Sequence, residues 1–406
     1  MNINLGYRQV GGAELVRNTL RIRLIALLVI TPLLLSSQFS TSHAAAKAGA
    51  KCLKVGSKSV VGAKTFTCIK SGNKMVWDRG VNKATLIPKT REEKAFELVR
   101  AAYLASPAYK APITYVVAEK YNQRFFELIK TGTEASAKFF QNYYKPQSEI
   151  PLIMADGEDI EWMISSMSKY GHELDNFGRK SFSTGGFGNA LTNGKSTILI
   201  YTGTPGKGKD IYAYGDMGFG VHEYVHVVTA GIVGKESKFG EVIPRWAYEG
   251  SASYFGNSIA ELLPGKGELS QRPMKRKFKT FYESAKNFLV RSSVPILHSL
   301  SSQQLYDTFM SPEIDAGNCP SAYCYTTGQF LTEALIADYG IDTYISWWRT
   351  SINTPWRSAF EKTFGVNFNQ WLAEVGIPYV MEGANKAYPE QPAHPDYKKK
   401  IEFTKS

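Results

Sequence analysis

The sequence predicts an α+β protein in which a small cysteine-containing β module precedes a larger unit of mixed sheet and helices. Two closely spaced cysteines near the N-terminus flank a stretch rich in β-branched residues. Apolar runs at 151–155 and 196–201 have the length and composition of buried strands, and much of the chain beyond residue 216 follows helical patterns. The roughly 360 residues after residue 46 are enough for one small module and one two-lobed unit.

Residues 1–46 have the pattern of a secretory signal peptide. Four arginines precede the apolar run Leu24–Leu35, and small residues follow it around Ala44–Ala46. This run is shorter than the ~20 residues that a membrane span needs. We therefore expect a secreted or cell-surface protein with no stable membrane span in the mature chain. An uncleaved N-terminal anchor is the alternative.

Residues 47–83 are predicted to form the small β module. Cys52 and Cys68 flank strand-like residues at 60–69, and another short strand is expected at 75–77. Cys319 and Cys324 form a second local pair. Four cysteines allow three pairings, and we favour pairing within each local segment. A bridge across the first loop would contribute ~3 kcal/mol. The segment 51–78 resembles a small module found at the front of exported bacterial proteins.

The following segment, 84–150, is expected to be helical. Residues 91–105 have an amphipathic pattern that ends at Ser106-Pro107, and 115–144 form a second helical pattern with a break near 131–133. The strand 151–155 then opens the main unit, which we place at 151–380. Residues 381–406 form a basic tail.

The pentapeptide His222-Glu223-Tyr224-Val225-His226 is the most informative stretch of the chain. The run 217–232 is apolar on most sides, and Asp216 is a suitable N-cap, so the pentapeptide is expected on a buried helix. Positions i and i+4 share one face of a helix. Both imidazoles can therefore ligate one Zn²⁺, with the Glu223 carboxylate close to a water on that ion.

A catalytic zinc site needs a third protein ligand. Glu249 is the candidate, because the segment 244–255 reads as a second packed helix and 22 residues separate Glu249 from His226. That distance lets the chain finish one helix, turn back and place Glu249 opposite the two imidazoles.

Together, HEYVH and PRWAYEGSASY resemble the paired motifs of the gluzincins, in the peptidase MA-like group. The resemblance implies a zincin-like fold, in which a mixed sheet and an active-site helix are followed by a helical lobe. It also implies a zinc-dependent peptidase acting on a peptide or protein substrate. His222, His226 and Glu249 would be the zinc ligands and Glu223 the general base. The chain departs from the pattern at Ser253, where many relatives carry an acidic residue.

A weaker resemblance continues through the helical lobe. In such relatives a tyrosine of this lobe can donate a hydrogen bond to the oxyanion, and Tyr325 is our candidate, with Tyr323 second. The strand 196–201 is expected to offer its edge to an extended substrate. The rival hypothesis is a noncatalytic surface protein that keeps the scaffold for binding or adhesion. The presence of Glu223 favours the enzyme.

The segment 203–210 matches a phosphate-binding loop except at its last position, where Asp210 replaces the hydroxyl that would bind Mg²⁺. We interpret it as a surface loop.

The basic composition has two interpretations. Without residues 1–46, 44 Lys and Arg remain against 35 Asp and Glu, a net charge of +9. The cluster at 272–279 and the lysines at 398–400 could attract anionic cell-wall polymers or acidic substrates. The alternative, which we favour, is a solvated helix face and a frayed terminus. Nothing resembles a nucleic-acid module, and no nucleic acid is expected among the partners.

Overall fold

The computed structural model describes residues 46–61, 64–79, 81–82, 89–174, 179, 187–192, 196–202, 216–234, 242–264, 297–311, 314, 323–387 and 393–403. Nearly all of the expected signal peptide, the loop at 203–210, the basic cluster at 272–279 and Cys319 lie outside these residues. The chain divides into two compact units, Met1–Leu86 and Ile87–Ser406. None of the described helices is long and apolar enough to cross a membrane.

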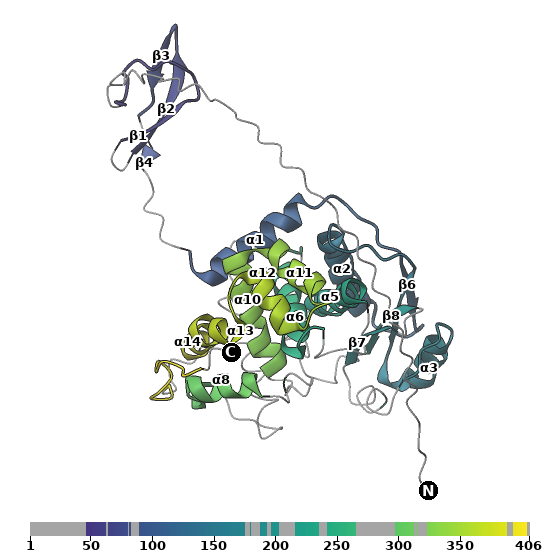
Figure 1. Cartoon of the computed structure of the whole chain (residues 1–406). Coiled ribbons are helices and arrows are strands. Elements are labelled where there is room, and N and C mark those ends of the chain that lie inside the picture. The colour runs from purple at the N-terminus through teal and green to yellow at the C-terminus, as the bar shows by residue number, and fades with distance from the viewer. Residues whose placement is uncertain are drawn as a thin grey trace, which may run out of the picture. The chain divides into compact units, whose positions relative to one another are not determined.

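The first unit contains a small antiparallel sheet (Figure 1). Its strands are β1 (Lys58–Val61), β2 (Lys64–Ser71), β3 (Lys74–Trp77) and β4 (Val81–Asn82), and β2 pairs with the other three. A disulfide joins Cys52 to Cys68, and both residues are buried. The predicted pairing of Cys52 with Cys68 is thus confirmed. Cys324 is also disulfide-bonded, and its expected partner Cys319 lies outside the described residues.

The second unit contains a mixed four-stranded sheet, which confirms the predicted α+β class with a mixed sheet. Its strands are β5 (Ile113–Val117), β6 (Ile150–Ala155), β7 (Phe187–Thr192) and β8 (Thr197–Thr202), in the order β5-β6-β8-β7. The pairs β5–β6 and β6–β8 are parallel, and β7–β8 is antiparallel. Every residue of β6 is buried, as its unbroken apolar sequence requires.

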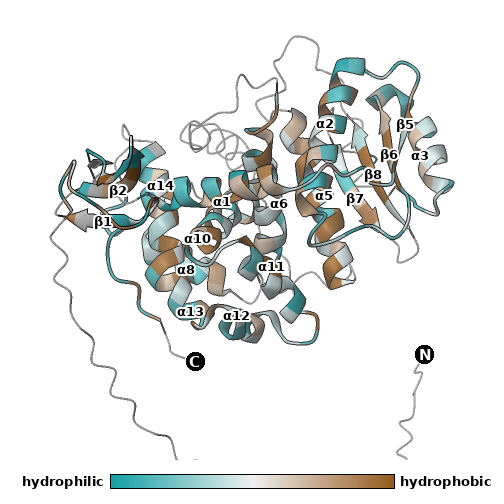
Figure 2. Cartoon of the chain, turned by 90° about the horizontal axis from the view of Figure 1, so that it is seen from above, coloured by the Kyte–Doolittle hydropathy of each residue, from teal (hydrophilic) through white to brown (hydrophobic). Residues whose placement is uncertain are grey.

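The helices of the second unit follow in chain order. They are α1 (Arg91–Ala105), α2 (Gln123–Phe140), α3 (Ile160–Ser168), α5 (Asp216–Val233), α6 (Arg245–Ala260), α8 (Ser302–Met310), α10 (Gly328–Tyr339), α11 (Ile341–Thr350), α12 (Trp356–Phe364), α13 (Phe368–Trp371) and α14 (Ile377–Ala387). Single π-helical turns occur at Tyr323–Thr327 and Leu372–Gly376, and short 3₁₀ turns at Gly157–Asp159 and Leu297–Ser299. Hydrophobic residues, brown in Figure 2, occupy the strands and the adjacent helix α5.

Helix α1 has the predicted bounds. The Thr90 side chain accepts a hydrogen bond from the Glu93 backbone N–H, and the Glu93 side chain accepts one from the Thr90 N–H. This capping box fixes the start of the helix.

The predicted helix at 115–144 is wrong at its start. Ile113–Val117 is a β-branched run that pairs with β6 as strand β5, so the segment 84–150 is not wholly helical. The predicted break at 131–133 is also wrong, because α2 continues through it. A Cβ at Gly132 would lie 1.9 Å from the Met217 carbonyl oxygen. The absence of a side chain at Gly132 therefore allows α2 to pack closely against α5.

Candidate functional site

Helix α5 carries His222, Glu223 and His226, and it packs closely against the neighbouring helices. It packs between α2 and α6. A Cβ at Gly256 of α6 would lie 2.9 Å from the carbonyl oxygen of Gly218 and 3.5 Å from the Cβ of His222. The absence of a side chain at Gly256 therefore allows α6 to approach α5 at the turn that carries His222.

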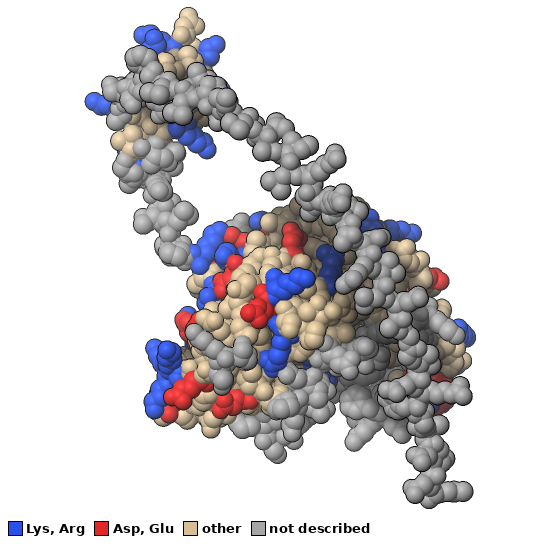
Figure 3. All heavy atoms as spheres, in the orientation of Figure 1, with Lys and Arg blue, Asp and Glu red and all other residues tan. Residues whose placement is uncertain are grey.

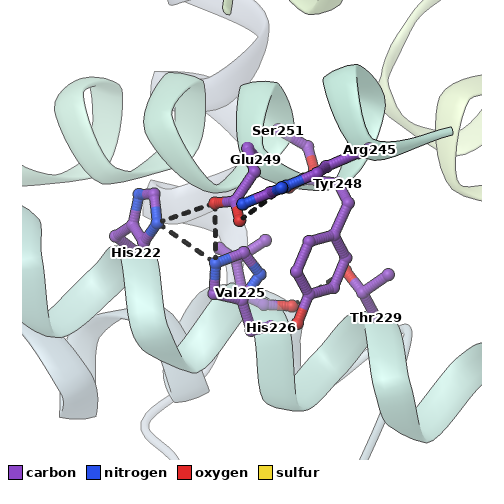
Figure 4. Close-up of polar contacts among 8 residues, drawn as sticks. All are labelled: His222, Val225, His226, Thr229, Arg245, Tyr248, Glu249 and Ser251. Carbon is purple, nitrogen blue, oxygen red and sulfur yellow. Dashed lines mark hydrogen bonds and ion pairs between the residues drawn. The ribbon is translucent and has the colours of Figure 1, made fainter. Parts of the chain in front are cut away.

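Three donor atoms from these two helices converge on one point (Figure 4). The Nε2 atoms of His222 and His226 lie 3.1 Å apart, and the Glu249 Oε2 atom lies 3.5 Å from the first and 3.3 Å from the second. His226 and Glu249 are buried, and His222 is partly exposed. The structure thus brings together the three residues that the sequence suggested as metal ligands.

The spacing of these atoms would allow all three to ligate one metal ion, and Zn²⁺ serves as an example. Zn²⁺ binds imidazole nitrogen and carboxylate oxygen at about 2.0–2.1 Å, which places neighbouring donors of a tetrahedron about 3.3 Å apart. The three measured separations lie within a few tenths of an ångström of that value. The Oε2 atom of Glu249 is buried without a hydrogen bond to any described residue. The three residues could therefore hold a cation at this point.

The Glu249 carboxyl is held in its ionised form. Burial alone would raise its pKa, but the two imidazoles outweigh that effect and lower the pKa well below its ordinary value. Arg245, one turn earlier on α6, places its Nε atom 4.0 Å from Glu249 Oε1. An anionic carboxylate is the form that ligates a metal.

The Glu223 side chain is 4 % exposed and lies beside the donor set. Burial raises its pKa, the two imidazoles lower it, and the negative charge of Glu249 raises it again, with a net shift upward. The backbone N–H of Ala190 donates a hydrogen bond to this carboxylate. Because Ala190 belongs to β7, this contact ties the sheet to the candidate general base.

Tyr325 lies in the site, as the sequence suggested. Its ring stacks on His222, with 5.7 Å between the ring centroids, and its hydroxyl donates a hydrogen bond to Glu249. Burial and the negative charges of Glu249 and Glu223 raise the pKa of Tyr325, so the hydroxyl keeps its proton. The second candidate, Tyr323, packs against Phe309 in the core.

The π-helical turn Tyr323–Thr327 sets the position of Tyr325. The turn leads directly into α10, and α10 packs on α6. A Cβ at Gly250 would lie 2.2 Å from the carbonyl carbon of Gly328. The backbones of α6 and α10 are therefore in direct contact at Gly250, the residue that follows Glu249. Such turns are often found at functional sites.

Two residues of the site were not singled out in the sequence. Tyr248 stacks on His226 with 4.0 Å between the ring centroids, and Arg245 approaches Glu249. Both could have been predicted from Glu249. Arg245 lies four positions earlier and so shares its helix face, and Tyr248 is the residue next to it in the sequence. Ser253, one turn after Glu249, is buried on the same helix.

The expected edge strand was assigned wrongly. The segment 196–201 corresponds to β8, which is paired on both sides, with β6 and with β7. The strand β7, which was not predicted, forms the end of the sheet and pairs only with β8 among the described residues. Its Gly188 lets the aromatic ring of Phe219 approach, because a Cβ there would lie 2.3 Å from that ring. A glycine within the strand weakens the sequence signal for β7.

Comparison of the chain with protein-family models, curated proteins and solved structures found no match.

Proposed function

We propose that this protein is an exported zinc-dependent peptidase of the gluzincin type. The observation that carries the proposal is the convergence of His222 Nε2, His226 Nε2 and Glu249 Oε2, with 3.1–3.5 Å between them. The order of the ligands, two histidines on one helix and a glutamate on the next, agrees with the motif resemblance. The buried carboxylate of Glu223 beside them is the group that separates a hydrolase from a simple metal-binding scaffold.

Zn²⁺ held by these residues would act as a Lewis acid and lower the pKa of water from ~15.7 toward ~7. Glu223 would accept the proton of the attacking water and return it to the departing amine. The N–H of Ala190 would keep the carboxylate oriented.

Tyr325 would donate a hydrogen bond to the oxyanion that develops on the substrate carbonyl. Its hydroxyl is held at the donor set by the stacked His222 ring and the Glu249 carboxylate. When the negative charge forms, the hydroxyl would shift its single hydrogen bond from Glu249 to the oxyanion beside it.

The substrate proposed for the site is an extended peptide or protein segment. β7 pairs only with β8 among the described residues, and one of its backbone groups contacts Glu223. An extended chain that adds to such an edge would lie across the candidate general base. The Cys52–Cys68 disulfide is typical of an oxidising compartment, which supports the export that residues 1–46 predict.

The test uses the mature protein, purified with its disulfides oxidised. Zinc content is measured by mass spectrometry, and cleavage is measured with a peptide library, for the wild type and Glu223→Gln. We expect about one zinc per chain in both proteins and a loss of cleavage of at least ~10³-fold in the variant. Glu333→Gln is the matched control, since Glu333 is equally buried but lies on α10 with its side chain bonded to Tyr379. A wild type without zinc, or equal cleavage by wild type and Glu223→Gln, would reject the proposal.

A further inference from the structure

The first unit carries a concentrated positive charge. Between residues 46 and 82 there are eight Lys and Arg and one acidic residue, Asp78. All eight cationic side chains are exposed: Lys47, Lys51, Lys54, Lys58, Lys64, Lys70, Lys74 and Arg79. The carboxylate of Asp78 accepts a hydrogen bond from the Thr67 backbone N–H at 3.0 Å and so takes part in the sheet. Figure 3 shows Lys and Arg side chains, in blue, projecting from this unit in several directions.

The same unit exposes large hydrophobic side chains. Five of the seven found among the described residues belong to it: Leu53, Val55, Val61, Ile69 and Met75. Leu53 is 74 % exposed and Val55 is 52 % exposed, and Lys54 stands between them. Single exposed apolar residues are ordinary, but here two of them lie in one loop with a lysine between them.

The loop that carries Leu53 and Val55 is fixed at both ends. The Cys52 N–H donates to the Met75 carbonyl at 3.0 Å, and the Gly56 N–H donates to the Cys68 carbonyl at 2.8 Å. Cys52 and Cys68 are also joined by the disulfide. Gly56 has a φ of +83°, which lets the chain turn there. A loop anchored in this way presents its side chains to a partner with little loss of conformational entropy.

We propose that the first unit binds the surface of a membrane that contains anionic phospholipids. Leu53 and Val55 would enter the boundary between headgroups and acyl chains, while Lys51, Lys54 and Lys58 would contact the phosphates. A soluble anionic polymer would need only the lysines. The exposed aliphatic side chains therefore favour a lipid surface. This binding is independent of the proposed peptidase activity.

The test measures flotation of the oxidised mature protein with vesicles of phosphatidylcholine, with or without about 30 mol % phosphatidylglycerol. We expect at least ~10-fold more protein on the anionic vesicles. Leu53→Asp/Val55→Asp and Lys51→Glu/Lys54→Glu/Lys58→Glu should each reduce binding at least ~10-fold. Leu53→Phe should increase binding, because a larger apolar side chain would enter the headgroup boundary. Leu104→Asp in α1, which changes a residue 52 % exposed in the second unit, is the matched control and should leave binding unchanged.

The alternative partner, a soluble polyanion, has a different outcome. If Leu53→Asp/Val55→Asp binds anionic vesicles like the wild type while the lysine variant does not, the attraction is purely electrostatic and the lipid proposal is wrong. Equal binding of the wild type to both kinds of vesicle, or to neither, also overturns it. Circular dichroism and the mass of the intact disulfide establish that each variant is folded.

Discussion

The ring of Tyr325 lies parallel to the imidazole of His222, with 8° between the two planes and 5.7 Å between their centroids. The two residues come from distant parts of the chain, and the contact exists because α10 and its preceding π turn pack on α6. The stacking fixes the ring, so that removal of the hydroxyl alone should not move it. This separates the chemical role of the hydroxyl from the packing of the ring.

Tyr325→Phe should lower kcat by ~10²-fold, because one hydrogen-bond donor to the oxyanion is lost. KM should stay close to that of the wild type, since the stacked ring remains, whereas zinc affinity should fall by about 10-fold because Glu249 loses a hydrogen bond. The measurement is steady-state cleavage of the best peptide from the library. Tyr323→Phe, which changes a tyrosine packed against Phe309, is the control and should keep full activity. An unchanged kcat in Tyr325→Phe would show that the hydroxyl takes no part in the reaction.

Glu249→Ala should lower zinc affinity by more than ~100-fold, because one of three protein ligands is removed. Arg245→Met should cost less, about 10-fold, since Arg245 lies beside the ligand Glu249 and is not itself a proposed ligand. Both affinities are measured by competition with a fluorescent chelator. The melting temperature of Glu249→Ala should also respond less to added zinc than that of the wild type. Equal zinc affinity in wild type and Glu249→Ala would show that Glu249 is not a zinc ligand.

Gly250→Ala should destabilise the second unit by ~3 kcal/mol or more, because the new Cβ would lie 2.2 Å from backbone atoms of Gly328. The helices α6 and α10 would have to separate, which would also move Glu249 and Tyr325 apart. Gly376→Ala is the matched control. Its Cβ would meet first a Leu331 methyl group at 2.9 Å, which can move, and we expect a smaller effect. Urea unfolding of both variants measures the difference, and equal losses would contradict the packing argument.

Glu333 should make the protein less stable as the pH rises. Its side chain is buried between the Tyr379 hydroxyl of α14 and the neighbouring Glu92 of α1 and Tyr254 of α6, and burial raises its pKa from 4.5 to about 8. Below pH 4.5 the carboxyl is protonated in both the folded and the unfolded state. Between pH 4.5 and 8 only the folded state keeps the proton, so its contribution to stability is lost progressively over this range.

The Glu333→Gln variant tests this pH dependence. The free energy of unfolding of the wild type should fall by on the order of 1–3 kcal/mol more than that of the variant between about pH 5 and pH 8.5. Urea unfolding at the two pH values gives both quantities. Glu158→Gln changes an exposed glutamate and should behave like the wild type. Parallel pH profiles for the wild type and Glu333→Gln would mean that Glu333 does not titrate in this range.

The fold was predictable where a local pattern dominates. The helix at 91–105 has a capping box and an end signal, and the buried strand at 150–155 has an unbroken apolar sequence. The predictions failed where contacts decide the outcome. Ile113–Val117 became a strand because β6 lies beside it, and β7 contains Gly188, Asn189 and Ala190, which have weak strand propensity.

The sequence by itself determined that His222 and His226 share one helix face, because i, i+4 spacing on a helix is a local property, and it offered Glu249 as the third candidate ligand. It also favoured the local pairing of Cys52 with Cys68, which the structure confirms. Only the tertiary structure decided that Glu249 faces both imidazoles, that Tyr325 and not Tyr323 reaches them, and that β7 rather than β8 forms the edge. These relationships depend on contacts between helices and strands distant in sequence, where single glycines set how closely two backbones approach.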